Sequence, residues 1–308
     1  MMELGEGPSR TVVVVGHSAL DHVYRVAELP ARPVKTRALE HIVTGGGMAA
    51  NAAVAIARLG GAVELWSRVG GDLAGQQILA QLAAEGVDTR CVRVCPGARS
   101  STSAIIVDGR GERIIVGERD HAMAVDAGWL PLGRIATAGA VLSDLRWYEA
   151  TRAAFSEARR SRVATVLDID LGGGDHVAEF LPLSDYAIFS APALDLFAPG
   201  RTLEHQLRRV LDLGVRHAGV TQGAGGYTWL DGGGDLRHQP AFAVSVVDTT
   251  GAGDAFHGAF AWGVARGETV AECARIASAT AALACRRLGA RVGMPSHDEL
   301  AASLAGSA

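Results

Sequence analysis

The hydrophobic positions of this chain fall into short continuous runs and into longer stretches with helical spacing. The first run, at residues 11–15, reads Thr-Val-Val-Val-Val and ends at Gly16. A continuous β-branched run of this kind is typical of a strand that is buried on both faces of a parallel sheet. Further strand-like runs lie at residues 63–66, 141–143, 165–168, 187–189 and 218–221.

Apolar residues with a period near 3.6 separate these runs and predict helices. The helical pattern occupies residues 48–59, 73–85, 149–159, 203–213, 252–266 and 270–288. Strands that alternate with helices indicate βαβ units and a mainly parallel sheet. The chain is therefore predicted to be a doubly wound α/β protein, with residues 1–308 as a single domain.

Two segments break this alternation. Residues 22–43 and 103–116 contain short strand-like pieces with no helix between them. In the second segment, Asp108-Gly109-Arg110-Gly111 has the composition of a hairpin turn. We expect the two segments to form strands of their own, outside the alternating pattern.

The most informative chemistry lies in a turn of small residues before a predicted helix, Asp248-Thr249-Thr250-Gly251-Ala252-Gly253-Asp254. Gly251, Ala252 and Gly253 have almost no side chain, so their N–H groups can approach a phosphate at the positive end of the helix dipole. Asp254, in the first helical turn, can take the proton from an attacking hydroxyl. Taken alone, the turn fits phosphoryl transfer and a plain helix cap equally well.

This turn resembles the C-terminal signature of the ribokinase-like, or PfkB, family of sugar kinases. The family's other signature is a di-glycine turn followed by an Asn in the next helix, and Gly45-Gly46-Gly47-Met48-Ala49-Ala50-Asn51 is similar to it. The resemblance extends from Val12 to residues 289–295 and covers nearly the whole chain. It implies an ATP-dependent kinase with a doubly wound fold, in which residues 22–43 and 103–116 form a small β lid over the sugar.

The same glycines support a rival interpretation. Residues 45–50 also fit the dinucleotide fingerprint G-x-G-x-x-A, with Glu64 about twenty residues downstream. This would indicate an NAD-dependent dehydrogenase. The fingerprint is displaced from the first strand, where a Rossmann domain would carry it, and it leaves residues 248–254 unexplained. A Walker A sequence is absent, which disfavours a P-loop NTPase.

The resemblance places ATP against the C-terminal half. Thr221-Gln222-Gly223-Ala224-Gly225-Gly226 is similar to the family's T-x-G-x-x-G turn. It makes Thr221, Gly223, Gly226 and Thr249 candidate ATP-binding residues.

Magnesium is expected as a cofactor because the charge of the transferred phosphoryl group must be neutralised. Many family members carry Asn-x-x-Glu to organise it, whereas this chain reads Ser190-Ala191-Pro192-Ala193. Asp248, with bound water, is therefore the candidate metal ligand, and K⁺ is a further candidate cofactor.

The resemblance places the sugar against the N-terminal half. Asp21 lies just past the first strand, and a carboxylate suits a sugar diol because it offers only acceptor sites. Gly46 and Gly47 allow close backbone approach, and the Asn51 amide can both donate and accept. These four residues are candidate substrate ligands.

Two basic residues raise the question of an anionic substrate. Lys35 lies in the first lid segment and Arg146 directly follows a predicted strand. Several segments resemble the sulfofructose kinase and ketohexokinase-type members of the family. In the former, a lid Lys, an Arg after a core strand and a lid Asn hold the sulfonate. Lys35 and Arg146 correspond to the first two, and Gly117 stands at the third position.

The sequence therefore predicts transfer of the ATP γ-phosphate to a hydroxymethyl group of a ketohexose-like sugar, either anionic, such as sulfofructose, or neutral. A ribokinase, nucleoside kinase or phosphosugar kinase of the same fold is the nearest alternative. A sugar-binding protein that has lost catalysis is the alternative from another class. The intact Asp254 argues against this last alternative.

Composition limits the partners. A net charge of −4 and a pI near 6.2 provide no basic surface for nucleic acid or an anionic membrane. No apolar run reaches about 18 residues and no signal-peptide pattern is present, so we expect a cytoplasmic protein with reduced cysteines. Unpaired lid edges, with apolar residues that need covering, predict a homodimer through the lids. Those apolar residues are Val23, Val26, Ile42, Ile105 and Ile115.

Overall fold

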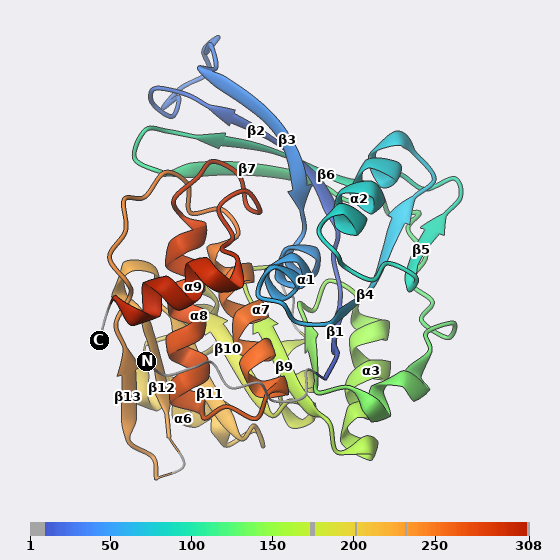
Figure 1. Cartoon of the computed structure of the whole chain (residues 1–308), viewed down its shortest axis with the longest axis vertical. Coiled ribbons are helices and arrows are strands. Elements are labelled where there is room, and N and C mark those ends of the chain that lie inside the picture. The colour runs from blue at the N-terminus through green and yellow to red at the C-terminus, as the bar shows by residue number, and fades with distance from the viewer. Residues whose placement is uncertain (1–9, 173–175, 201, 232, 307–308) are drawn as a thin grey trace.

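A nine-stranded, mainly parallel sheet forms the centre of the molecule, which confirms the predicted fold class (Figure 1). The computed structural model describes residues 10–172, 176–200, 202–231 and 233–306. Along the sheet, the strand order is β13-β12-β11-β10-β9-β8-β1-β4-β5, and only β12 and β13 run antiparallel to their neighbours. The strands are β1 (Val12–Val15), β4 (Val63–Gly70), β5 (Val92–Cys95), β8 (Ala140–Ser143), β9 (Ala164–Ile169), β10 (Tyr186–Ser190), β11 (His217–Thr221), β12 (Tyr227–Leu230) and β13 (Leu236–Gln239).

Helices cover both faces of the sheet, which is why the core strands are apolar throughout. On β1, Val12 and Val14 belong to one buried cluster, and Val13 and Val15 belong to the other. The first cluster includes residues of α1 (Met48–Arg58), α2 (Leu73–Ala84), α7 (Ala252–Ala265), α8 (Val270–Ala284) and α9 (His297–Ala305). The second includes residues of α3 (Tyr148–Ser161), α4 (Val177–Phe180), α5 (Ala191–Phe197) and α6 (Leu203–Leu211).

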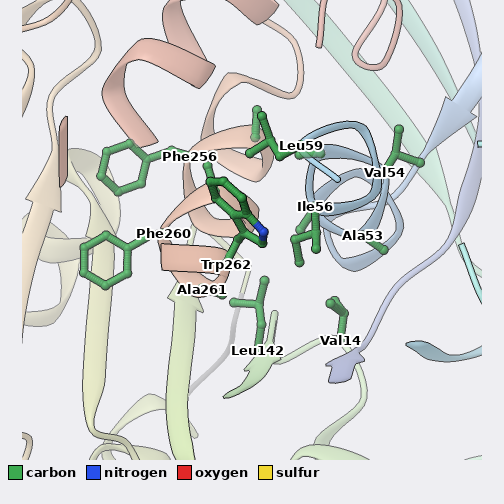
Figure 2. Packing of buried hydrophobic residues seen from close by; sticks show 14 of the residues in the cluster. Val14, Ala53, Val54, Ile56, Leu59, Leu142, Phe256, Phe260, Ala261 and Trp262 are labelled. Carbon is green, nitrogen blue, oxygen red and sulfur yellow. The ribbon is translucent and has the colours of Figure 1, made fainter. Parts of the chain in front are cut away.

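Helices α1 and α7 pack unusually closely. A Cβ atom at Gly258 of α7 would lie 2.5 Å from the carbonyl oxygen of Ala52 on α1, so glycine is required at this crossing. Below it, Trp262 packs beside Ile56 over the sheet (Figure 2). Because the two backbones touch, polar side chains at the N-terminal ends of α1 and α7 come within hydrogen-bonding distance of each other.

The predicted lid is a separate four-stranded sheet that stands above one end of the central sheet (Figure 1). Its strand order is β3-β2-β6-β7, and a turn at residues 108–112 joins the last two strands. The strands extend somewhat beyond the predicted segments. They are β2 (Ala19–Arg25), β3 (Glu40–Gly46), β6 (Ser101–Val107) and β7 (Arg113–Glu118).

The inner face of the lid already has an apolar partner within the chain. Val23 and Ile105 are buried against Leu288, and Ile42 packs on the same cluster. Val26 is also buried, whereas Ile115 is half exposed. The prediction that these residues need covering by a second chain was therefore wrong for Val23, Ile42 and Ile105, which pack with Leu288 of the loop after α8, and for Val26, which is already buried.

Three details of the helices differ from the sequence pattern. Helix α8 ends at Ala284, and the carbonyl of Cys285 then accepts hydrogen bonds from the N–H groups of Val247 and Asp248. Helix α9 begins with a capping box formed by Ser296 and Glu299, which the apolar pattern did not reveal. Helix α5 begins at Ala191, directly after the Ser190 cap.

Candidate active site

The phosphate turn lies at the N-terminus of α7. Gly251 is the N-cap residue with a φ of 77°, and a Cβ atom there would lie 2.7 Å from the Cβ atom of Ala290. Only glycine meets both conditions without strain. Gly253 faces open space, with nothing within 4 Å of a Cβ atom added there. The predicted cradle of small residues is therefore accessible at the positive end of a 14-residue helix.

Asp248 stabilises this turn through hydrogen bonds with backbone N–H groups. It is almost completely buried, and its two carboxylate oxygens accept hydrogen bonds from the N–H groups of Thr250 (2.9 Å) and Gly289 (2.8 Å). These bonds tie the turn to the segment after α8. Each carboxylate oxygen of Asp248 thus already accepts one backbone hydrogen bond, and its role as a magnesium ligand stays a prediction.

Asp254 lies next to Asn51, as the close packing of α7 on α1 dictates. The Asn51 Nδ2 atom donates to Asp254 Oδ2 at 2.7 Å. Burial and the negative charge of the neighbouring Asp168 together raise the pKa of Asp254 to about 7, although the Asn51 hydrogen bond opposes the shift. A carboxylate with a pKa near neutral pH is well suited to accept a proton from a hydroxyl group.

The sequence analysis missed an arginine at this site. Arg291, on the segment after α8, is buried, and its Nε atom donates to Asn51 Oδ1 at 2.8 Å. Its Nη2 atom donates to the carbonyl oxygen of Gly46 at 2.9 Å. No local sequence pattern marks this residue, because its partners lie far away along the chain.

Asp21 and the glycines form the other wall of the site. Asp21 is 5% exposed, and burial raises its pKa despite a hydrogen bond with Ser103. A Cβ atom at Gly46 would lie 2.1 Å from Asp21 Oδ2. Gly47 is the N-cap of α1 with a φ of 87°, and a Cβ atom there would lie 2.5 Å from the His17 carbonyl oxygen. The structure thus brings Asp21, Gly46, Gly47 and Asn51 together as predicted.

A cluster of arginines lies beside this wall. Burial, together with the positive charges of Arg119, Arg146 and Arg68, lowers the pKa of His17 to about 3, so all three arginines lie close enough for their charges to act on His17. Arg146 donates to the carbonyl oxygens of Leu171 and Gly172. Arg119 has no hydrogen-bond acceptor among the residues that the structure describes, and the sequence analysis did not single it out.

Lys35 lies elsewhere. It is exposed in the loop between β2 and β3. That loop follows the pair Arg25 and Glu40, at the opposite end of the hairpin from the pair Ala19 and Gly46 that adjoins α1. Within a single chain, Lys35 therefore does not lie beside Arg146.

The candidate ATP turn follows β11, at the carboxyl edge of the sheet. Gly223 and Gly226 both have positive φ values, and a Cβ atom at Gly226 would lie 2.3 Å from the Gln239 carbonyl oxygen. Thr221 pairs with Ser190 of β10. Ser190 in turn donates to Asp170 Oδ1 at 2.6 Å, and Asp170 contributes to the raised pKa of Asp254. The candidate ATP turn therefore lies at the same edge of the sheet as Ser190 and Asp170.

Thr249 has a different environment from the one predicted. Its hydroxyl donates to the Gly111 carbonyl oxygen at 3.4 Å and accepts a hydrogen bond from Arg113. Both partners belong to the β6–β7 hairpin of the lid. The Thr249 side chain, which was predicted to bind ATP, therefore connects the phosphate turn to the lid by hydrogen bonds.

The profile of the pfkB family of carbohydrate kinases matches residues 9–297. The chain belongs to this family. A crystal structure of a provisionally named ribokinase from Agrobacterium tumefaciens has 34% identity and a TM-score of 0.92, covering 97% of this chain and 98% of that chain. Ribokinase of Arabidopsis thaliana, solved with ribose and ATP, has 26% identity and a TM-score of 0.82, covering 96% and 99%. The ATP-dependent ribose-1-phosphate kinase of Halopiger xanaduensis is 30% identical, covering 95% of this chain and 97% of its own length.

Membership of the pfkB family settles the choice between the two interpretations of the first glycine motif. In this carbohydrate kinase, Gly45 and Gly46 end a lid strand, β3, rather than following a core strand as in a dinucleotide-binding domain. The motif therefore presents backbone to the candidate sugar site, and the dehydrogenase interpretation is excluded. Among the described residues, no helix is long and apolar enough to cross a membrane.

Proposed function

We propose that this pfkB-family carbohydrate kinase transfers the γ-phosphate of ATP to a hydroxymethyl group of a ketohexose-like sugar that carries an anionic group. The observation that carries the transfer step is the position of Asp254, held by Asn51 at the N-terminus of α7 with a pKa of about 7. The ATP bound in the Arabidopsis ribokinase supports the choice of donor.

In this mechanism, the sugar lies between Asp21 and the backbone of Gly46 and Gly47, with the acceptor hydroxyl next to Asp254. Asp254 takes the hydroxyl proton as the oxygen attacks the γ-phosphorus, whose bond to the β–γ bridging oxygen breaks so that ADP leaves. The N–H groups of Gly251, Ala252 and Gly253 then stabilise the negative charge on the transferred group. The lid, fastened to Thr249, excludes water that would otherwise accept the phosphoryl group.

Magnesium is expected to enter with ATP and to neutralise the phosphate charge. Such an ion commonly keeps several water ligands and needs few side chains from the protein. Among the described residues, no group of three or more His, Cys, Asp or Glu side chains could hold a metal ion. Thr221, Gly223 and Gly226 would lie along the ATP phosphates, and the K⁺ requirement can be measured in the same assay.

The anionic group on the sugar is proposed from Arg119 and Arg146. Gly117 pairs with Ser103 beside Asp21, and Arg119 directly follows the end of β7 at Glu118. Arg119 is exposed and has no hydrogen-bond acceptor among the described residues, so its guanidinium group is available to a ligand anion. The Halopiger xanaduensis relative, whose sugar substrate carries a phosphate, supports this class of acceptor.

A neutral pentose is the second candidate, because the Arabidopsis and Agrobacterium relatives are both named ribokinases. The deciding experiment is an ATP-coupled assay, with and without K⁺, over ribose, fructose, nucleosides, sugar phosphates and sulfofructose. We expect the highest kcat/KM on a sulfonated or phosphorylated sugar. The highest value on ribose would overturn the anionic proposal, and no turnover of any sugar would overturn the kinase proposal itself.

A further inference from the structure

We propose that Arg291 is a positioning residue that fixes the orientation of the Asn51 amide and thereby keeps Asp254 able to act as a base. This inference rests on the proposed function, because it concerns the proton acceptor of the transfer step. It adds a residue from the segment after α8 to a site otherwise built by the lid, α1 and α7.

The direction of the hydrogen bonds carries the inference. A guanidinium group only donates, so the Asn51 atom 2.8 Å from Arg291 Nε must be the carbonyl oxygen. The amide nitrogen of Asn51 then faces Asp254, to which it donates at 2.7 Å. Without Arg291, the amide could rotate and present its oxygen to Asp254. That arrangement is favourable only when Asp254 is protonated, because two acceptors cannot share a hydrogen bond without a proton.

The surroundings hold the guanidinium group in place. Its Nη2 atom bonds the Gly46 carbonyl oxygen, and a Cβ atom at Gly45 would lie 1.8 Å from its Nη1 atom. The glycine at position 45 therefore makes room for the arginine. From the other side, Arg58 Nη1 donates to the carbonyl oxygens of Arg291 (2.7 Å) and Met294 (2.9 Å), which fixes the segment that carries it.

A purely structural role does not account for this residue well. Arg291 is 3% exposed and its Nη1 atom has no hydrogen-bond partner among the described residues, so burying the charge costs free energy. An apolar side chain of similar volume would fill the same space without that cost. The charge is explained if it serves the polar chain from Gly46 through Asn51 to Asp254.

Several other groups also shift the pKa of Asp254, and a test of Arg291 must keep them constant. Asp168 and Asp170 of the β9 end raise its pKa, His257 of α7 lowers it, and Arg291 lies close enough for its charge to interact with Asp254. Replacing Arg291 leaves the first three groups unchanged. A change in the pKa of Asp254 would then report the loss of the cation and of the amide orientation.

The experiment measures the pKa of Asp254 directly, by NMR of ¹³C-aspartate-labelled protein with Asp254→Asn as the assignment control. It also measures the pH profile of kcat on the best sugar. We expect Arg291→Met to raise the Asp254 pKa by about one unit or more and to lower kcat at pH 7 by about tenfold, with recovery toward pH 9. Arg291→Lys keeps the positive charge but lacks the paired N–H donors that bond both Asn51 and Gly46. The increase in the Asp254 pKa should therefore be smaller than in Arg291→Met. Arg287→Met removes an exposed arginine from the same segment and should change neither value.

Two further results make the test decisive. In an Asn51→Ala background, Arg291→Met should produce a clearly smaller shift, because the amide through which Arg291 acts is gone. An unchanged Asp254 pKa in a folded Arg291→Met protein, or an equal loss of kcat at every pH, would overturn the inference. If the wild-type protein phosphorylates no sugar, the proposed function fails, yet the NMR measurement still decides whether Arg291 controls Asp254.

Discussion

The two halves of the candidate active site are built in opposite ways. The phosphate half comes from one short stretch, Gly251 to Asp254, in which the turn and the helix that follows supply both the amides and the carboxylate. The acceptor half gathers Asp21 from β2, Gly46 from β3, Asn51 from α1 and Arg291 from the segment after α8. Arg291 and Asn51 lie 240 positions apart in the chain.

This difference teaches where chemistry is visible in a sequence. Backbone amides at a helix N-terminus depend on local φ and ψ values, which glycines encode on their own. The acceptor half depends instead on the contact between α1 and α7, where Gly258 meets Ala52. The amide of Asn51 acquires its role only because that contact brings Asp254 and Arg291 to either side of it.

The largest loss of kcat is expected when the proton acceptor, where the two halves meet, is replaced. Asp254→Asn keeps the shape of the side chain but cannot accept a proton, so kcat should fall by about 10²–10⁴-fold. ATP binding, measured by calorimetry, should remain nearly unchanged because the amides of the turn are intact. A variant that keeps most of the wild-type kcat would show that another group accepts the proton.

The next effect is specific to the acceptor half. If the sugar carries the proposed anionic group, Arg119→Met and Arg146→Met would each remove a charge-assisted hydrogen bond to it, which is worth about 1.5–3 kcal/mol. This corresponds to a loss of about one to two orders of magnitude in kcat/KM on sulfofructose or a sugar phosphate. Fructose should be affected little, since a hydroxymethyl group gains little from either cation.

Lys35→Met is the matched control for these arginine variants, because Lys35 is an exposed cation at the far end of the lid hairpin. It should leave kcat/KM unchanged on both kinds of sugar. Equal losses on charged and neutral sugars would contradict the anionic substrate. A large loss of kcat/KM in Lys35→Met would instead mean that Lys35 contacts the sugar.

A third prediction concerns stability rather than rate. The pKa of Asp254 is about 7 in the folded protein against 3.8 as its ordinary value, so the folded state binds more protons between these pH values. The stability of the wild type therefore falls as pH rises through this window, whereas Asp254→Asn has no such group. We expect the variant to have the higher Tm at pH 8 and the difference to shrink toward pH 4, by differential scanning calorimetry. A difference that does not vary with pH would mean that the pKa of Asp254 is not raised.

The smallest effect on activity is expected at the outer face of the lid. Val43, Ile114 and Val116 are exposed there, on the face opposite Asp21 and Val23. We expect this face to pair with a second lid. Val116→Glu should convert a dimer into a monomer in light scattering and should change kcat only slightly, because the inner face is already covered by Leu288. A wild-type monomer at micromolar concentration would contradict the dimer.

Most of the framework could be predicted because periodicity records burial. The continuous Val12–Val15 run and the helical spacing in α1 and α7 each correspond to an observed element. The errors have local causes. The end of α8 is set by the Cys285 carbonyl, whose backbone donors lie nearly forty residues away, and α9 depends on a capping box rather than on an apolar face.

The sequence by itself determined the alternating α/β architecture, the lid strands and the phosphate turn, and it marked Asp21 and Asn51 as candidate ligands, because propensity, periodicity and glycine placement act over a few residues. The tertiary structure alone decided the rest. In the folded chain, Asp248 accepts a hydrogen bond from Gly289 and Thr249 donates one to the lid. Lys35 lies away from Arg146, and Arg291 lies beside Asn51. A side chain's hydrogen-bond partners depend on which distant segments pack against it, and the pattern around each residue contains no record of that packing.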